Sequence, residues 1–157
     1  MARILPWAAA DAAAMSRAFA VEADRWTRHL AWDTRELWPA VERARQAGRL
    51  EGVVVDDGAG GIAGWAYFAC RDGDLQIGAV AAGAPADTAA LIDAVLASPH
   101  AADARRAVVF AFSEAPALGE VLSSRGFLHD GYAYLVRPVG PSAPPSVPGR
   151  AWDLRDL

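Results

Sequence analysis

The chain has 157 residues, of which 54% are hydrophobic and 22% are charged, and its formal net charge is −4. This length and composition predict one globular domain and argue against a disordered chain. Every cationic side chain apart from histidine is an arginine, and no basic run occurs, so the sequence argues against nucleic-acid binding through neutralised phosphates. No apolar run has the length of a membrane span and the N-terminus lacks the order of a signal peptide, so we expect a cytoplasmic protein that does not enter a membrane.

A single cysteine, Cys70, excludes an internal disulfide. No spacing of Cys and His residues indicates a metal site, so we predict none. The sequence around Cys70 is apolar, and we therefore expect it to be a small core residue and not a reactive thiol.

The N-terminal third predicts one short strand and two helices. The strand covers Ala2–Trp7, and an alanine-rich helix follows over Asp11–Ala20 with Asp11 as its N-cap. Pro39 suits the first turn of the second helix better than its middle, because proline lacks a backbone N–H. Gly48 is placed to end that helix.

The middle of the chain predicts an antiparallel meander. A strand over Leu50–Asp56 leads into a hairpin whose turn, Arg71–Asp74, contains Asp-Gly between apolar runs. The first hairpin strand is apolar on both faces, which indicates a central position in the sheet. Its residues are expected to alternate, with Ile62, Gly64, Ala66, Phe68 and Cys70 on one face. The second strand, Leu75–Ala81, contains Gly78, which indicates a bulge or the close approach of another group.

The C-terminal half predicts a helix over Pro85–Ser98, then a buried parallel strand over Arg106–Phe112. A short helix, Pro116–Ser124, and a last strand, Phe127–Val136, complete the pattern. The segment from Pro138 to Gly149 contains five prolines and is typical of an extended linker.

This order of strands and helices is similar to that of the GCN5-related N-acetyltransferase (GNAT) family. Three segments resemble the family locally: Leu75–Ala81 with the following helix, Phe110–Ser113, and Leu118–Phe127 with its Gly-Phe pair. The resemblance implies an α+β fold, with a mixed, mainly antiparallel sheet flanked by helices and with splayed fourth and fifth strands. It makes residues 1–138 a GNAT-like acyltransferase domain and residues 139–157 a proline-rich linker and C-terminal tail.

The resemblance also implies acetyl-CoA as the cofactor. In the family, its pantetheine amides pair with the fourth strand, which here places them on the backbone of Ile77, Gly78, Ala79 and Val80. Its pyrophosphate lies at the next helix N-terminus, where free N–H groups and the helix dipole favour an anion. The residues at that position here are Gly83, Ala84, Asp87 and Thr88.

This turn departs from the family pattern, which usually has Arg or Gln and two or more glycines. The turn has one glycine, Gly83, followed by Pro85, which has no N–H, and by Asp87, whose charge repels pyrophosphate. We therefore expect acetyl-CoA to bind weakly.

The catalytic groups that the resemblance implies are also incomplete. Many family members protonate the leaving thiolate with a tyrosine, and Leu122 stands at that position here. The base is often a carboxylate on the central strands, but Asp74 lies at the turn and Gln76 cannot act as a base. Glu22, Glu114, Asp33 and His29 are left, and we take Glu114, Asp33 and His29 as the catalytic candidates. Positioning and carbonyl polarisation by strand amides can supply much of the rate, so a missing tyrosine does not exclude catalysis.

The tryptophans after the first helix have two interpretations. In the family this region lines the acceptor pocket, so Trp26 and Trp32 could bind an apolar or aromatic amine. The alternative, which we favour, is that they cap a thin alanine-rich core.

Two functions follow. The first is an acetyl-CoA-dependent N-acyltransferase that acts on an amine of a small molecule or a protein. The second is a catalytically degenerate GNAT-like domain that serves as a binding or structural half of a larger, tandem acetyltransferase. The possible protein partners are a second copy of the chain, in a homodimer, or a second GNAT domain. The segment Arg150–Leu157 is either the start of a second GNAT copy or an edge strand anchored by Trp152.

Overall fold

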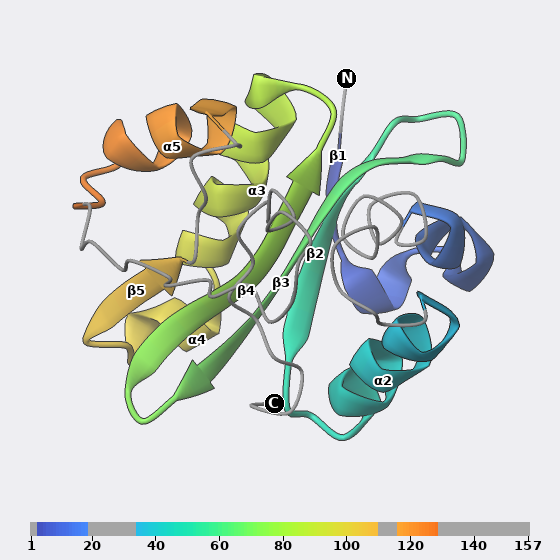
Figure 1. Cartoon of the computed structure of the whole chain (residues 1–157), viewed down its shortest axis with the longest axis horizontal. Coiled ribbons are helices and arrows are strands. Elements are labelled where there is room, and N and C mark those ends of the chain that lie inside the picture. The colour runs from blue at the N-terminus through green and yellow to red at the C-terminus, as the bar shows by residue number, and fades with distance from the viewer. Residues whose placement is uncertain (1–2, 19–33, 110–115, 129–157) are drawn as a thin grey trace, which may run out of the picture.

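The structure, a computed structural model, describes residues 3–18, 34–109 and 116–128. Five strands form one sheet in the order β1-β2-β3-β4-β5, and helices cover both of its faces (Figure 1). Neighbouring strands from β1 to β4 are antiparallel, whereas β4 and β5 are parallel. The predicted α+β fold with a mixed, mainly antiparallel sheet is therefore confirmed.

The order of the strands and of the longer helices agrees with the prediction across the described residues. The strands are β1 (Arg3–Pro6), β2 (Glu51–Asp56), β3 (Ile62–Arg71), β4 (Asp74–Ala82) and β5 (Arg106–Val109). The helices are the 3-10 helix η1 (Trp7–Ala9), α2 (Thr34–Gln46), α3 (Pro85–Leu96), α4 (Pro99–Ala102) and α5 (Pro116–Ser123), and residues 12–18 are also helical. The sequence did not predict α4. The last predicted strand, Phe127–Val136, lies outside the described residues from position 129 onward.

The central hairpin forms through the turn that its sequence predicts. Asp72 and Gly73 have φ angles of 53° and 81°, and Arg71 pairs with Asp74 across the two strands. Positive φ at both central residues defines the two-residue turn whose twist matches that of antiparallel strands. Local chemistry alone therefore fixes the register in which β4 begins.

Helix ends also follow local rules. The N–H of Ala14 donates to the Asp11 carboxylate at 2.7 Å, which confirms the predicted N-cap. Gly48 and Gly126 have φ angles of 67° and 80°, and each follows a helix that ends with the two backbone hydrogen bonds of a Schellman motif. The helix end that was predicted at Gly48 is confirmed.

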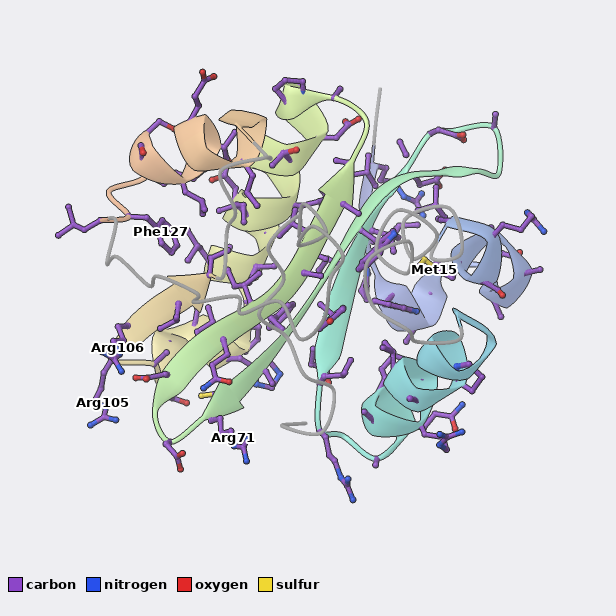
Figure 2. The ribbon with its side chains drawn as sticks, in the orientation of Figure 1. Met15, Arg71, Arg105, Arg106 and Phe127 are labelled. Carbon is purple, nitrogen blue, oxygen red and sulfur yellow. The ribbon has the colours of Figure 1, made fainter. Side chains whose placement is uncertain are left out.

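Each face of the sheet has its own apolar core. The aromatic core lies under α2 and the N-terminal helix, from which Met15 points toward the sheet (Figure 2). Its buried members are Trp7, Met15, Val41, Leu50, Val54, Trp65, Tyr67, Ala79 and Ala81. The aliphatic core lies under α3 and α5, and its buried members are Val55, Ala66, Phe68, Leu75, Ile77, Leu91, Ile92, Val95, Val121 and Leu122.

Two bulges change the alternation of side chains along the strands. Val55 pairs with Gly64 and Asp56 pairs with Ile62, so Ala63 is the extra residue between them. As a result Ile62 packs against the aromatic core and Ala63 against the aliphatic core. The prediction that Ile62 shares a face with Ala66 and Phe68 is therefore wrong, because one extra residue reverses the faces.

Two further predictions need correction. Cys70 is exposed and not a core residue, although Leu75, with which it pairs across the hairpin, is buried. Pro39 lies inside α2 and not in its first turn, since the helix already begins at Thr34. Interior proline removes one helix hydrogen bond, and the fully buried Val41 nevertheless anchors this helix on the aromatic core.

An ion pair closes the end of the sheet at which β4 and β5 begin. Asp74 stands directly opposite Arg106, whose Nε and a terminal nitrogen lie 3.0 and 2.8 Å from the same carboxylate oxygen. This hydrogen bonding holds the pKa of Asp74 below its usual value. Arg71, Arg105 and Arg106 project from this end, far from α3's N-terminus (Figure 2).

The close packing of β3, β4 and α3 at Gly64 yields a stability prediction. A Cβ atom at Gly64 would lie 2.9 Å from both the Ala81 carbonyl oxygen and the Ala82 Cβ. We expect Gly64→Ala to lower the free energy of unfolding by about 1–3 kcal/mol, as other overpacked sites do.

Urea denaturation measures this change. Gly83→Ala is the matched control, because a Cβ there has nothing within 4 Å and the φ of Gly83 is not positive. Equal stabilities for the two variants would contradict the packing described here.

Candidate donor site

The site begins at a bulge in the middle of β4. Tyr67 pairs with Ala79 and Phe68 pairs with Ile77, so Gly78 is the extra residue between them. The extra residue of a bulge is left out of the ladder, and it bends and twists its strand. The bulge predicted at Gly78 is confirmed.

Gly78 is required by space and not by backbone conformation. Its φ lies outside the positive range, whereas a Cβ atom here would overlap Cε2 of the Tyr67 ring and lie 2.8 Å from Cδ2. The close approach predicted at Gly78 is therefore that of an aromatic ring from the neighbouring strand. Sequence reasoning identified the glycine and missed Tyr67, for which the alternation of Trp65 and Tyr67 along β3 was the available signal.

The bulge also decides which residues face which core. Leu75 and Ile77 pack in the aliphatic core, but Ala79 and Ala81 pack in the aromatic core. The register places Ala81 opposite Trp65 and Ala79 opposite Tyr67. Two small residues thus stand beside two large rings, and the extra residue makes this arrangement possible.

Beyond the bulge, β4 leads directly into α3 through an exposed turn. The turn comprises Gly83 and Ala84, and Ala84 is the extended N-cap residue of α3. We call the backbone of residues 77–80 together with residues 83–88 the β4–α3 site.

The first turn of α3 has few free donors. Pro85 has no N–H, and the N–H groups of Asp87 and Thr88 both donate to the Ala84 carbonyl at 3.1 Å. The Gly83 N–H points to the Ala63 carbonyl, 3.5 Å away. Among the described residues, the amides of Ala84 and Ala86 are therefore the donors that this turn can offer an anion.

Two side chains predicted to bind cofactor have different surroundings. Thr88 is only 7% exposed, and its hydroxyl lies 3.3 Å from the Ala84 carbonyl, to which it can donate. Asp87 makes no capping hydrogen bond and is partly exposed in the first turn of α3. Its negative charge occupies the end of the helix dipole that would otherwise favour phosphate.

Leu122, which stands where the resemblance implies a tyrosine, is buried. The side chain of Leu122 is 6% exposed and packs in the aliphatic core together with Val121. A core leucine cannot supply a proton.

The first cationic side chain after α5, that of Arg125, is in an ion pair. Its guanidinium pairs with Asp93 of α3 and donates to the Val121 carbonyl at 3.1 Å. The pair lowers the pKa of Asp93 and raises that of Arg125, mainly through the hydrogen bond between them. This pair links the end of α5 to the middle of α3 and not to the N-terminus of α3. Sequence reasoning missed it because the two residues are far apart in the chain.

Five of the predicted site residues lie outside the described part of the chain. The catalytic candidates Glu114, Asp33 and His29 lie outside the described residues, as do Trp26 and Trp32. Of the backbone positions predicted to bind cofactor, Ile77, Gly78, Ala79 and Val80 lie together at the bulge, while Gly83 and Ala84 lie at the turn.

Within residues 3–18, 34–109 and 116–128, no group of three or more His, Cys, Asp or Glu side chains could hold a metal ion. No described helix is long and apolar enough to cross a membrane.

The sequence matches no family model and no curated protein. Solved structures do match. Aminoglycoside N-acetyltransferase AAC(6')-Iy, in complex with the bisubstrate analogue CoA-S-monomethyl-acetylneamine, is 14% identical over 88% of this chain and 98% of that chain, with a TM-score of 0.64.

Two other similar structures extend this comparison. A predicted acetyltransferase with acetyl-CoA from Clostridium acetobutylicum is 11% identical over 87% of this chain and 96% of that one, with a TM-score of 0.64. A ribosomal-protein-alanine N-acetyltransferase from Brucella melitensis is 14% identical over 87% and 99%, with a TM-score of 0.61. The chain thus has the fold of the GNAT acetyltransferases.

Proposed function

We propose that this protein is an N-acyltransferase that takes an acetyl group from acetyl-CoA and transfers it to an amine. The observation that carries the proposal is the bulge at Gly78, which lies in β4 directly ahead of α3 in a fold shared with acetyltransferases. The nitrogen of the acceptor attacks the thioester carbonyl, the C–S bond breaks, and CoA leaves as a thiol after its thiolate takes up a proton. The amine gives up a proton to a base, and the amide product remains.

The backbone of the β4–α3 site is the proposed donor-binding surface. Main-chain groups of residues 77–80 can pair with the amides of the pantetheine arm and polarise the thioester carbonyl. Glu114, Asp33 and His29 remain the proposed bases, and Trp26 and Trp32 the proposed contacts to the acceptor.

The acceptor is an amine of a small molecule or a protein. The printed names of the similar structures include an aminoglycoside N-acetyltransferase and a ribosomal-protein-alanine N-acetyltransferase. Both kinds of acceptor are therefore compatible with this fold, and fold alone does not choose between them.

A second function is favoured by two specific observations. Asp87 places a negative charge in the first turn of α3, and Leu122 fills a core position where many GNAT enzymes have a tyrosine. Both fit a domain of this fold that has lost catalysis and serves as the binding or structural half of a larger acetyltransferase.

Calorimetric titration with acetyl-CoA, followed by measurement of thiol release with a panel of amines, tests the proposal. We expect saturable binding with one acetyl-CoA per chain, and CoA release that depends on one class of amine. Binding without thiol release for any amine would favour the degenerate half, and the absence of binding would reject the donor site.

The charge of Asp87 generates a prediction about affinity. If pyrophosphate lies at α3's N-terminus, Asp87→Asn removes a like charge and should tighten acetyl-CoA binding about two- to fivefold. The gain should shrink as salt is added, because exposed charges are screened.

Calorimetry on Asp87→Asn and on a control variant measures this effect. Asp103→Asn is the control, since Asp103 is an exposed aspartate that follows α4. Unchanged or weaker binding by Asp87→Asn would mean that the pyrophosphate lies elsewhere.

Residues 139–157 are proposed to be a linker and tail outside the domain formed by residues 1–138. Deletion of residues 141–157 should therefore leave the Tm nearly unchanged, since those residues would add little to either core. A large fall in Tm, or a change from dimer to monomer, would show that the tail belongs to the fold or to an interface.

A further inference from the structure

We infer that Tyr67 is a positioning residue for the acyl donor: its ring holds the bulge at Gly78 and so sets the course of the β4 backbone. This inference rests on the proposed function, because it concerns the same β4–α3 site. Tyr67 acts through Gly78 and is not proposed to touch the donor.

The first support is the position of the ring. Tyr67 is 3% exposed, and its ring atoms occupy the space in which any residue other than glycine at position 78 would place its Cβ. Because the φ of Gly78 is not positive, the backbone itself does not demand glycine there. The ring and the glycine are therefore one steric unit.

The second support is that neighbouring aromatic groups fix the ring. Tyr67 stacks on Trp65 with ring centroids 6.0 Å apart and planes inclined by 8°, and Trp65 in turn lies 6.0 Å from Trp7. On the β2 side, Gly52 pairs with Tyr67, and Trp7 fills the space above Gly52. The rings of Trp7, Trp65 and Tyr67 thus cover the face of the sheet that packs in the aromatic core, from β2 to β4. The Tyr67 ring lies over β4 at Gly78.

The third support is where the bulge falls along β4. From Gly78 to Ala82, β4 continues toward the turn that opens α3. A bend at Gly78 therefore sets the direction of the part of β4 that is proposed to pair with the pantetheine arm.

Binding energy from a strand of backbone groups depends on their geometry, and small displacements are costly. Replacing the ring with a smaller side chain should let β4 relax toward regular pairing with β3. The donor would then meet misdirected backbone groups, although both cores could still form.

Two variants of Tyr67 separate the ring from the hydroxyl. Tyr67→Phe keeps the ring and should bind acetyl-CoA within about twofold of the parent, whereas Tyr67→Leu should weaken binding roughly tenfold to a hundredfold. Gly78→Ala should weaken binding to a similar degree, because its Cβ displaces the ring. A Tyr67→Phe variant that loses as much affinity as Tyr67→Leu would overturn the role of the ring.

Val54→Ala controls for loss of core packing. Val54 is fully buried in the same aromatic core but lies on β2, away from Gly78. It should lower the Tm as Tyr67→Leu does and leave acetyl-CoA affinity unchanged. An equal loss of affinity in both variants would reduce Tyr67 to an ordinary core residue and overturn the inference.

Amide hydrogen exchange of the unliganded variants separates this inference from the proposed function. Tyr67→Leu should change exchange at residues 78–80, while Val54→Ala and Tyr67→Phe should not. If the parent protein binds no acetyl-CoA, the donor role is overturned along with the proposed function, and the exchange result then decides only whether Tyr67 holds the bulge. Unchanged exchange in Tyr67→Leu would overturn the inference even if acetyl-CoA binds to the parent.

Discussion

The contact between the Tyr67 ring and the backbone at Gly78 is the constraint on which the rest of the sheet depends. An aromatic side chain over β4 leaves no space for a Cβ atom at Gly78, and this extra residue reverses the alternation of β4. Ile77 therefore faces α3 while Ala79 faces the aromatic core. Without this reversal, the bulky residues of β4 and the rings of β3 would compete for the same layer.

The same constraint connects the fold to its proposed chemistry. The bulge lies in β4, and the chain then enters α3 within a few residues. An acetyl-CoA molecule that binds the main-chain groups at the bulge would need few contacts to side chains. This fits a sequence that has kept the strand geometry while the N-terminus of α3 bears Asp87 and the late helix has Leu122 in its core.

Sequence predicted the features that depend on a few neighbouring residues. The turn at Asp72-Gly73, the cap at Asp11 and the helix end at Gly48 each need only local chemistry, and each is found. The bulge at Gly78 was also predicted, because glycine inside a strand is unfavourable without a reason of this kind.

Sequence failed where the outcome depends on distant parts of the chain. The faces of Ile62 and Ala63 depend on a bulge that forms against β2. The exposure of Cys70 depends on which distant segments pack beside the end of β3. Apolar neighbours in sequence cannot report either fact.

Arg125 and Asp93 come together only when α5 packs on α3. No local sequence pattern therefore predicts this ion pair. The predicted donor-binding residues fall together at the β4–α3 site because they are consecutive in one strand and turn. The predicted bases and acceptor contacts came from other segments and stay predictions.

The measurement that tests the central claim most directly is residue-resolved amide exchange with and without acetyl-CoA. Donor binding to the backbone at the bulge predicts slowed exchange at residues 77–80, with a smaller effect at residues 83–86. Slowed exchange confined to other parts of the chain, or no change at saturating acetyl-CoA, would contradict the account.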